Sequence, residues 1–258
     1  MQRSMNSLAG FSIGATDGEI GKVEEFYFDD TTWTIRYIIV KTGGWLTGRK
    51  VLISPEAILH KDWDNKILPA NLTRKQVEES PDIDTDKPLS RQQEDELFAY
   101  YPWQSYYDAG LYGEGIGMMG VFALPPILEV VEPGETNEEK VEKPKIETHL
   151  RSTHELKGYT IHATDGEIGE VADFLFDEEA WNITFVVVKT GSWFSGKKVL
   201  LSPAWIKEVK WNNQELTVNV TMNEVENSPE YDSSKPLEMD YAKELHNHYS
   251  SKKDNPGL

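Results

Sequence analysis

Pairs of carboxylates recur in the sequence and are the first residues with catalytic potential. Asp17 and Glu19 flank a glycine, and Asp165 and Glu167 repeat the arrangement. Neighbouring carboxylates can act as general acid and general base. An Asp-Gly pair is also typical of a tight turn, because glycine accepts backbone angles that other residues avoid. No second catalytic partner follows at a fixed offset. We therefore interpret these acids as turn residues and predict no catalytic residue.

A second acidic pattern resembles the start of a calcium-binding loop. Asp82, Asp84 and Asp86 alternate in the way that the first ligands of such a loop do. The sixth position, which needs glycine, is Lys87, and the twelfth position, which needs a bidentate glutamate, is Gln93. The pattern therefore does not predict a calcium site.

Two histidines near the end of the chain are of a residue type that often binds metal ions. His246 and His248 are two positions apart, beside Glu244. On a helix this spacing directs the two side chains to different faces, whereas a ligand pair needs a spacing of three or four. We predict neither a metal nor a cofactor.

Two loops with large apolar residues between glycines are the candidate interaction surface. Trp45 and Leu46 lie at the centre of one loop, and Trp193 and Phe194 at the centre of the other. Exposed aromatic side chains on loops often anchor protein interfaces. The alternative is that each tryptophan folds back to close the end of its own domain, or packs on the other half of the chain.

The two loops belong to a long internal repeat. One constant shift superimposes the second half of the chain on the first without a gap, and roughly half of the positions in 8–89 are identical. Three tryptophan positions are repeated in this way, as the pairs Trp33/Trp181, Trp45/Trp193 and Trp63/Trp211. The Lys-Thr-Gly and Ser-Pro motifs are shared as well. Self-similarity on this scale predicts two structural units.

Each unit has a run of strand patterns followed by helix patterns. Ile35–Val40 and its counterpart Ile183–Val188 are apolar at nearly every position, as in a strand that is covered on both faces. Short strands are expected nearby, at 50–54 and 57–63. Thr73 and Thr221 then begin sequences with capping-box spacing, which predict short helices.

Composition excludes several classes of protein. The 258 residues contain no cysteine and carry a formal net charge of −18, so disulfides and thiolate sites are absent and nucleic acid is an unfavourable partner. The start of the chain lacks the pattern of a secretory signal, and the apolar run 116–131 is interrupted by glycines and prolines. We expect a cytoplasmic protein without an integral membrane segment.

A family resemblance rests on the Asp17–Gly21 turn, the strand through Val40 and the end of the strand at Val51–Pro55. In these features, each repeat resembles the PRC-barrel domain. This family includes the cytoplasmic barrel of the photosynthetic reaction centre H subunit. The segments Ser80–Glu94 and Tyr100–Trp103 are similar to the tail of stand-alone bacterial PRC-barrel proteins. The resemblance implies a mainly β fold of two tandem small β-barrels, each with short C-terminal helices. It also implies function by protein contact without a common active site.

The predicted domains are a first PRC-barrel-like repeat at 6–104, a linker at 105–153 and a second repeat at 154–250. The linker is rich in glycine and aromatic residues in 106–131, then becomes charged. The expected function is a non-enzymatic protein-protein interaction or scaffolding module, whose repeats bind partner proteins or pack together as an intramolecular pseudo-dimer or homo-oligomer.

Two alternatives remain open. The first is a small-ligand-binding protein or enzyme with a pocket between the barrels, lined by Trp63, Trp211 and linker aromatics. The second is a peripheral membrane-associated adaptor that contacts lipid through Leu111–Leu128.

Overall fold

The computed structural model describes residues 1–83, 89, 91–101, 103, 149–191, 196–235, 237 and 239–250. The chain divides into two units, of which the first comprises Met1–Leu89 with His149–Leu258 and the second comprises Ser90–Thr148. The first unit contains both sequence repeats and every strand that lies within the described residues. In the second unit, helix α2 spans Arg91–Tyr100, and the ring of Tyr101 stacks on that of Trp103 with centroids 3.9 Å apart.

The first repeat forms a sheet with strand order β5-β4-β3-β2-β6. Its strands are β2 (Ser12–Ala15), β3 (Gly18–Asp29), β4 (Ile35–Thr42), β5 (Lys50–Ile53) and β6 (Ile67–Pro69). Neighbouring strands are antiparallel except for the parallel pair β2 and β6. The predicted strand at 57–63 is instead a 3-10 turn followed by isolated bridges at Ile58 and Asp62.

The second repeat forms the corresponding sheet, with order β11-β10-β9-β8-β13-β12. Its strands are β8 (Thr160–His162), β9 (Glu167–Asp177), β10 (Ile183–Thr190), β11 (Lys198–Leu201), β12 (Ile206–Lys210) and β13 (Glu215–Val218). Here the segment that corresponds to 57–63 forms a strand, β12, which pairs with β13 and has one register shift between Ile206 and Glu208.

The fold is mainly β, as expected, but the two sheets do not close into barrels. The strand order of each is a path with two ends, and the end strands β5 and β6 are not hydrogen-bonded to each other. Closure requires a ladder of hydrogen bonds around the whole barrel. The end strands have only four and three residues, which is too few to continue the ladder. The expected mainly β fold is therefore confirmed, whereas the sheets of the two expected β-barrels are open.

Short helices accompany the sheets. They are the 3-10 turns Met5–Leu8, Gly44–Leu46, Pro55–Ala57, Pro203–Trp205 and Trp211–Asn213 and the α-helices α1 (Arg74–Glu78), α3 (Thr153–Leu156), α4 (Met222–Glu226) and α5 (Met239–Ser250). The capping boxes expected at Thr73 and Thr221 are confirmed, since each hydroxyl accepts a backbone N–H and each backbone N–H is bonded in return. These reciprocal bonds satisfy donors that a helix start leaves unpaired.

The central strand is buried on both faces, as its apolar run predicts. All six residues of Ile35–Val40 are buried, including Arg36, which pairs with the buried Asp29 at 3.2 Å. A glycine permits the close packing of β3 on this strand. A Cβ atom on Gly21 would lie 2.1 Å from the carbonyl oxygen of Lys41, and one on Gly169 would lie 2.2 Å from that of Lys189. Any other residue at these two positions would push the strands apart.

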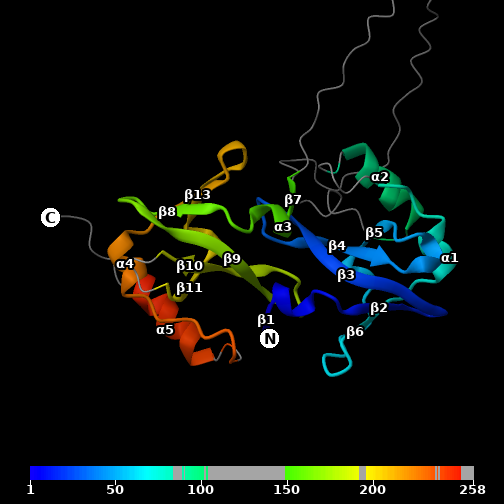
Figure 1. Cartoon of the computed structure of the whole chain (residues 1–258), viewed down its shortest axis with the longest axis horizontal. Coiled ribbons are helices and arrows are strands. Elements are labelled where there is room, and N and C mark those ends of the chain that lie inside the picture. Colours follow the sequence, from blue (N-terminus) through cyan, green and yellow to red (C-terminus); the bar gives the residue numbers. More distant parts are fainter. Residues whose placement is uncertain are drawn as a thin grey trace, which may run out of the picture. The chain divides into compact units, whose positions relative to one another are not determined.

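The two repeats exchange their first strands. Strand β1 (Gln2–Ser4) precedes the first sheet in sequence but pairs with β9 of the second, and β7 (Leu150–Ser152) pairs with β3 of the first. Figure 1 shows β1 beside β9 and β7 beside β3. The segment expected to be linker thus ends in a strand of the first sheet. The repeats form an intramolecular pseudo-dimer.

Further contacts join the repeats at the turns between their long strands. The N–H of Ile35 donates to the Trp181 carbonyl and the N–H of Ile183 donates to the Trp33 carbonyl, both at 2.8 Å. Between these bonds lies an antiparallel bridge from Thr34 to Asn182. The equal distances reflect an approximate two-fold relation between the repeats.

Candidate functional site

The turns that join the repeats hold a tryptophan in an unusual backbone conformation. The carboxylate of Asp29 accepts the N–H groups of Thr31 and Thr32 at 3.0 and 2.8 Å, which tightens the turn before Trp33. Trp33 has a φ of 58°, a left-handed value that is uncommon for a residue with a side chain. Its ring stacks on Phe28 with centroids 5.2 Å apart, and this buried contact compensates for the backbone cost.

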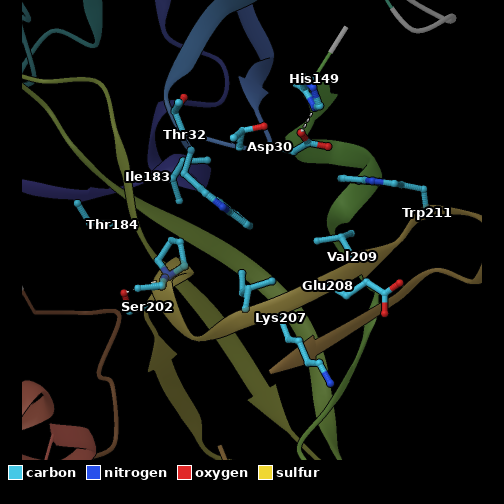
Figure 2. Close-up of a pocket in the computed structure, with 15 residues that line it drawn as sticks. Asp30, Thr32, His149, Ile183, Thr184, Ser202, Lys207, Glu208, Val209 and Trp211 are labelled. Carbon is cyan, nitrogen blue, oxygen red and sulfur yellow. Dashed lines mark hydrogen bonds and ion pairs between the residues drawn. The ribbon is translucent and has the colours of Figure 1, made fainter. Parts of the chain in front are cut away.

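A pocket of about 800 Å³ opens between the repeats beside this turn. Its walls come from the turn of the first repeat, the start of β10 and the segment through β12 of the second. The lining includes Asp30, Trp33, His149, Glu208, Val209 and Trp211. In Figure 2, Ile183 and Val209 lie on opposite sides of the opening, and Asp30 and His149 lie together at one end.

The acid at that end of the pocket is held by two basic groups. Asp30 Oδ1 lies 3.1 Å from His149 Nδ1, and Asp30 Oδ2 accepts Arg151 Nε at 3.1 Å. The Arg151 guanidinium also lies over the Trp211 ring, 4.6 Å from its centroid. Strand exchange creates this cluster, because β7 carries Arg151 from the second repeat to the edge of the first sheet. We call Asp30, Trp33, Arg151, Val209 and Trp211 the Val209 junction.

The equivalent residues at the other turn form the same framework. Arg3 Nε donates to Glu178 at 3.0 Å, and its guanidinium lies 4.2 Å from the centroid of Trp63. The internal repeat aligns Arg3 with Arg151, Glu178 with Asp30, and Trp63 with Trp211. The residue near the second tryptophan differs in charge between the two junctions. Lys61, which aligns with Val209, lies with its ammonium 5.2 Å from the centroid of Trp181. We call Glu178, Trp181, Arg3, Lys61 and Trp63 the Lys61 junction.

The hydroxyl groups around the pocket are bonded to the protein itself. Thr32 donates to the Asp29 carboxylate at 3.1 Å, and Thr184 donates to the Leu175 carbonyl at 3.1 Å. Ser202 accepts the N–H of Ala204 at 3.3 Å at the start of a 3-10 turn. These bonds hold the walls of the pocket.

The predicted interaction loop of the first repeat lies against its own sheet. The indole N–H of Trp45 donates to the Ile20 carbonyl at 2.9 Å, and the Arg74 guanidinium lies 4.2 Å from the ring centroid. Trp45 and Leu46 are both half-buried. The geometry corresponds to the alternative in which the tryptophan folds back on its own domain. Trp193 and Phe194 lie outside the described residues.

The paired acids at the Asp-Gly turns have structural bonds. Asp17 accepts the N–H of Arg74 at 2.8 Å, and Asp165 accepts that of Met222 at 2.7 Å. Each aspartate therefore connects its turn to the first residue of a short helix, α1 or α4. The sequence predicted the turns but not this bond, because the aspartate and the helix are far apart in the chain.

The two metal-like patterns lie partly outside the described residues. Asp84 and Asp86 are outside, and Asp82 lies 3.5 Å from Arg49 Nε. Nothing is described for the side chain of His246, whereas His248 Nε2 is 2.7 Å from the Glu224 carbonyl. Within the part of the chain that the structure describes, no group of three or more histidines and acids is arranged to hold a metal ion.

Sequence reasoning missed most residues of the Val209 junction. The repeated tryptophans marked Trp33 and Trp211, but His149 and Arg151 fell in the segment expected to be linker. A pocket between the repeats was one of the alternatives, with Trp63 and Trp211 as lining. Only Trp211 lines the pocket, since Trp63 belongs to the Lys61 junction. The linker aromatics lie outside the described residues.

The fold and this site define a protein of two β-rich domains that are joined by exchanged strands around pseudo-equivalent aromatic junctions. The model of the PRC-barrel domain matches the chain twice, at residues 3–77 and 149–222, which together are more than half of its length. The chain belongs to the PRC-barrel domain family, as a tandem member. A search of curated proteins gave no match. Every helix in the described ranges is too short or too polar to traverse a lipid bilayer.

Proposed function

We propose that the protein is a non-enzymatic protein-protein interaction or scaffolding module, and that the pocket of the Val209 junction is its contact site. The observation that carries this proposal is an opening of about 800 Å³ at the boundary between two domains, lined by Trp33 and Trp211. Tryptophan is enriched among the residues that dominate binding energy in protein interfaces, and such residues lie in pockets.

The rigidity of the surroundings supports recognition. The pocket walls come from both repeats, which exchanged strands and backbone bonds hold together. A binding surface of this kind is already ordered before the partner arrives, so little conformational entropy is lost on binding. The Arg151 side chain adds to the order, because it is held between Asp30 and Trp211.

The test is capture of proteins from source-cell lysate by the immobilised full chain, read by mass spectrometry. Val209→Phe places a larger side chain in the pocket, and Lys61→Phe is the matched control at the other junction. We expect a specific protein to be retained by the wild type and by Lys61→Phe, and lost by Val209→Phe while that variant remains folded. Equal retention by both variants would remove the pocket from the proposal, and no retention by the wild type would remove the interaction function.

A second candidate is a small-ligand-binding protein. The volume of the pocket falls within the range of about 300–1,000 Å³ that is typical of ligand sites, which also favour domain boundaries. A thermal-shift screen against nucleotides, metabolites and metal ions tests this candidate, since a ligand that binds the folded state raises its melting temperature. A compound that stabilises the wild type but not Val209→Phe would favour it over the interaction module.

A further inference from the structure

We infer that the pocket of the Val209 junction receives a lysine or arginine side chain from a partner protein. This inference rests on the proposed interaction function and specifies the chemistry of the partner. Four features of the junctions carry it: an internal model of the contact, the space left by a valine, an acid at the rim and the charge of the chain.

The Lys61 junction is the internal model. There the chain places its own ammonium group 5.2 Å from the centroid of Trp181, within the distance at which a cation is attracted to an aromatic face. Around it lie an arginine stacked on a tryptophan and an acid bonded to that arginine. The Val209 junction repeats this framework, with Arg151 on Trp211 and Asp30 bonded to Arg151.

The Val209 junction has a valine at the position where the Lys61 junction has its cation. Valine is shorter than lysine and has no charge, so it leaves the space beside Trp33 open as part of the pocket. Trp33 and Trp181 are otherwise alike, with φ values of 58° and 54° and exposed fractions of 9% and 7%. Each also stacks on a phenylalanine of the strand that precedes its turn, Phe28 of β3 or Phe176 of β9. A side chain that enters the pocket therefore meets the surface that Lys61 meets in the other junction.

Two acids, Asp30 and Glu208, line the pocket together with Lys207. Glu208 lines the pocket, and among the described residues its carboxylate makes no ion pair. Asp30 adds negative charge but is already bonded to His149 and Arg151, so Glu208 is the acid that remains for a partner. Lys207 is exposed, and in Figure 2 its side chain extends away from Asp30 and His149. The net charge of −18 also attracts a basic partner over a longer range.

The experiment is a titration of the full chain with three short peptides that differ in one residue. The probes are acetyl-Gly-Lys-Gly-amide, the corresponding arginine peptide, and a norleucine peptide that has the length of lysine without its charge. Binding is followed through the indole N–H resonances, with that of Trp33 assigned from a Trp33→Phe variant. We expect the lysine and arginine peptides to shift the Trp33 resonance in a saturable way, and the norleucine peptide to bind about tenfold more weakly or not at all.

Matched substitutions locate the site. Val209→Lys copies the Lys61 junction, so we expect the ammonium of this variant to occupy the pocket and to weaken lysine-peptide binding about tenfold. Lys61→Val copies the Val209 junction, and we expect it to add a second site, seen as a shift of the Trp181 resonance. If Val209→Lys does not fold, Glu208→Gln at the exposed rim replaces it, with an expected weakening of about threefold.

Each result decides the inference. Equal binding of the norleucine and lysine peptides would overturn it, because the pocket would then select apolar groups. Unchanged lysine binding in Val209→Lys would also overturn it, because the site would lie elsewhere. Failure here, together with capture of a protein that Val209→Phe abolishes, would leave the interaction function standing and reject only the basic side chain. Success here without any captured protein would reject the interaction function and retain a cation-binding pocket.

Discussion

The two junctions between the repeats have the same framework but different contents. In both, an arginine from an exchanged strand lies on a tryptophan and bonds to an acid, and a second tryptophan occupies a left-handed backbone position. The Lys61 junction places a cation on that second tryptophan, whereas the Val209 junction has a pocket there. The framework is present in both copies, and the exchange of Lys61 for Val209 is the difference at the position that faces the second tryptophan.

Substitution of the aspartates that begin the two turns, the buried Asp29 and the half-buried Asp177, should show the largest difference in stability. Asp29 pairs with the buried Arg36 at 3.2 Å, whereas the second repeat has Thr184 at the position of Arg36, and Asp177 lies 3.5 Å from the amino group of Met1. Asp29→Ala leaves a buried guanidinium without its carboxylate, so we expect a loss of about 3–5 kcal/mol in the free energy of unfolding. Asp177→Ala removes the turn bonds to Glu179 and Ala180, with an expected loss of about 1 kcal/mol.

Urea unfolding of the two variants measures this difference. The control is the double variant Asp29→Ala/Arg36→Thr, which gives the first repeat the residue of the second at position 36 and should recover part of the loss. Equal losses for the two single variants would show that the Asp29–Arg36 pair does not distinguish the turns.

The two exchanged strands, β1 and β7, have equivalent geometry. We expect them to contribute equally to the free energy of unfolding. Ser4 donates to the carboxylate of Asp173 in the second repeat, and Ser152 donates to that of Glu25 in the first. Hydrogen bonds to charged groups contribute about 1.5–3 kcal/mol, so we expect Ser4→Ala and Ser152→Ala each to lower the free energy of unfolding by this amount. Chemical denaturation provides the measurement. A loss in only one variant would mean that a single exchanged strand carries the coupling.

Exchange of the residues that distinguish the junctions should have a smaller effect. Lys61→Val removes the ammonium from Trp181, and we expect a loss of about 0.5–1 kcal/mol in stability. Val209→Lys should produce a gain of similar size by adding the contact to Trp33. Differential scanning fluorimetry compares both with the double exchange, which should restore the wild-type value. A destabilised Val209→Lys would contradict the equivalence of the two tryptophans.

The smallest expected effect is a pH dependence at one turn. The N–H groups of Ala180 and Glu179 donate to Asp177 and lower the pKa of its carboxyl below the ordinary value. Because the unfolded chain then binds more protons than the folded one, this stabilisation is present above the ordinary pKa of about 3.9 and is lost as the pH falls through the lower folded value. The difference in melting temperature between wild type and Asp177→Asn should shrink as the pH is lowered from about 6 toward 3. A constant difference would contradict this origin.

The sequence predicted features whose causes are local. The Asp-Gly turns, the capping boxes at Thr73 and Thr221 and the doubly covered strand Ile35–Val40 all follow from short-range bonding or periodic burial. Whether the expected β-barrels are closed or open was not predictable, because closure depends on the lengths and positions of strands that are far apart in sequence. The site was found only in part, because the repeated tryptophans were visible but the groups from β7 that complete it were not.

By itself, the sequence determined that the chain contains two equivalent β-rich units and that Lys61 and Val209 occupy the same position in them. Only the tertiary structure decided where the first strands pair. Because β3 and β9 have equivalent sequences, β1 has matching partners in its own repeat and in the other, and no local pattern distinguishes them. The choice depends on packing across the whole boundary, such as Phe28 against Phe174, and this choice places Arg151 at the pocket.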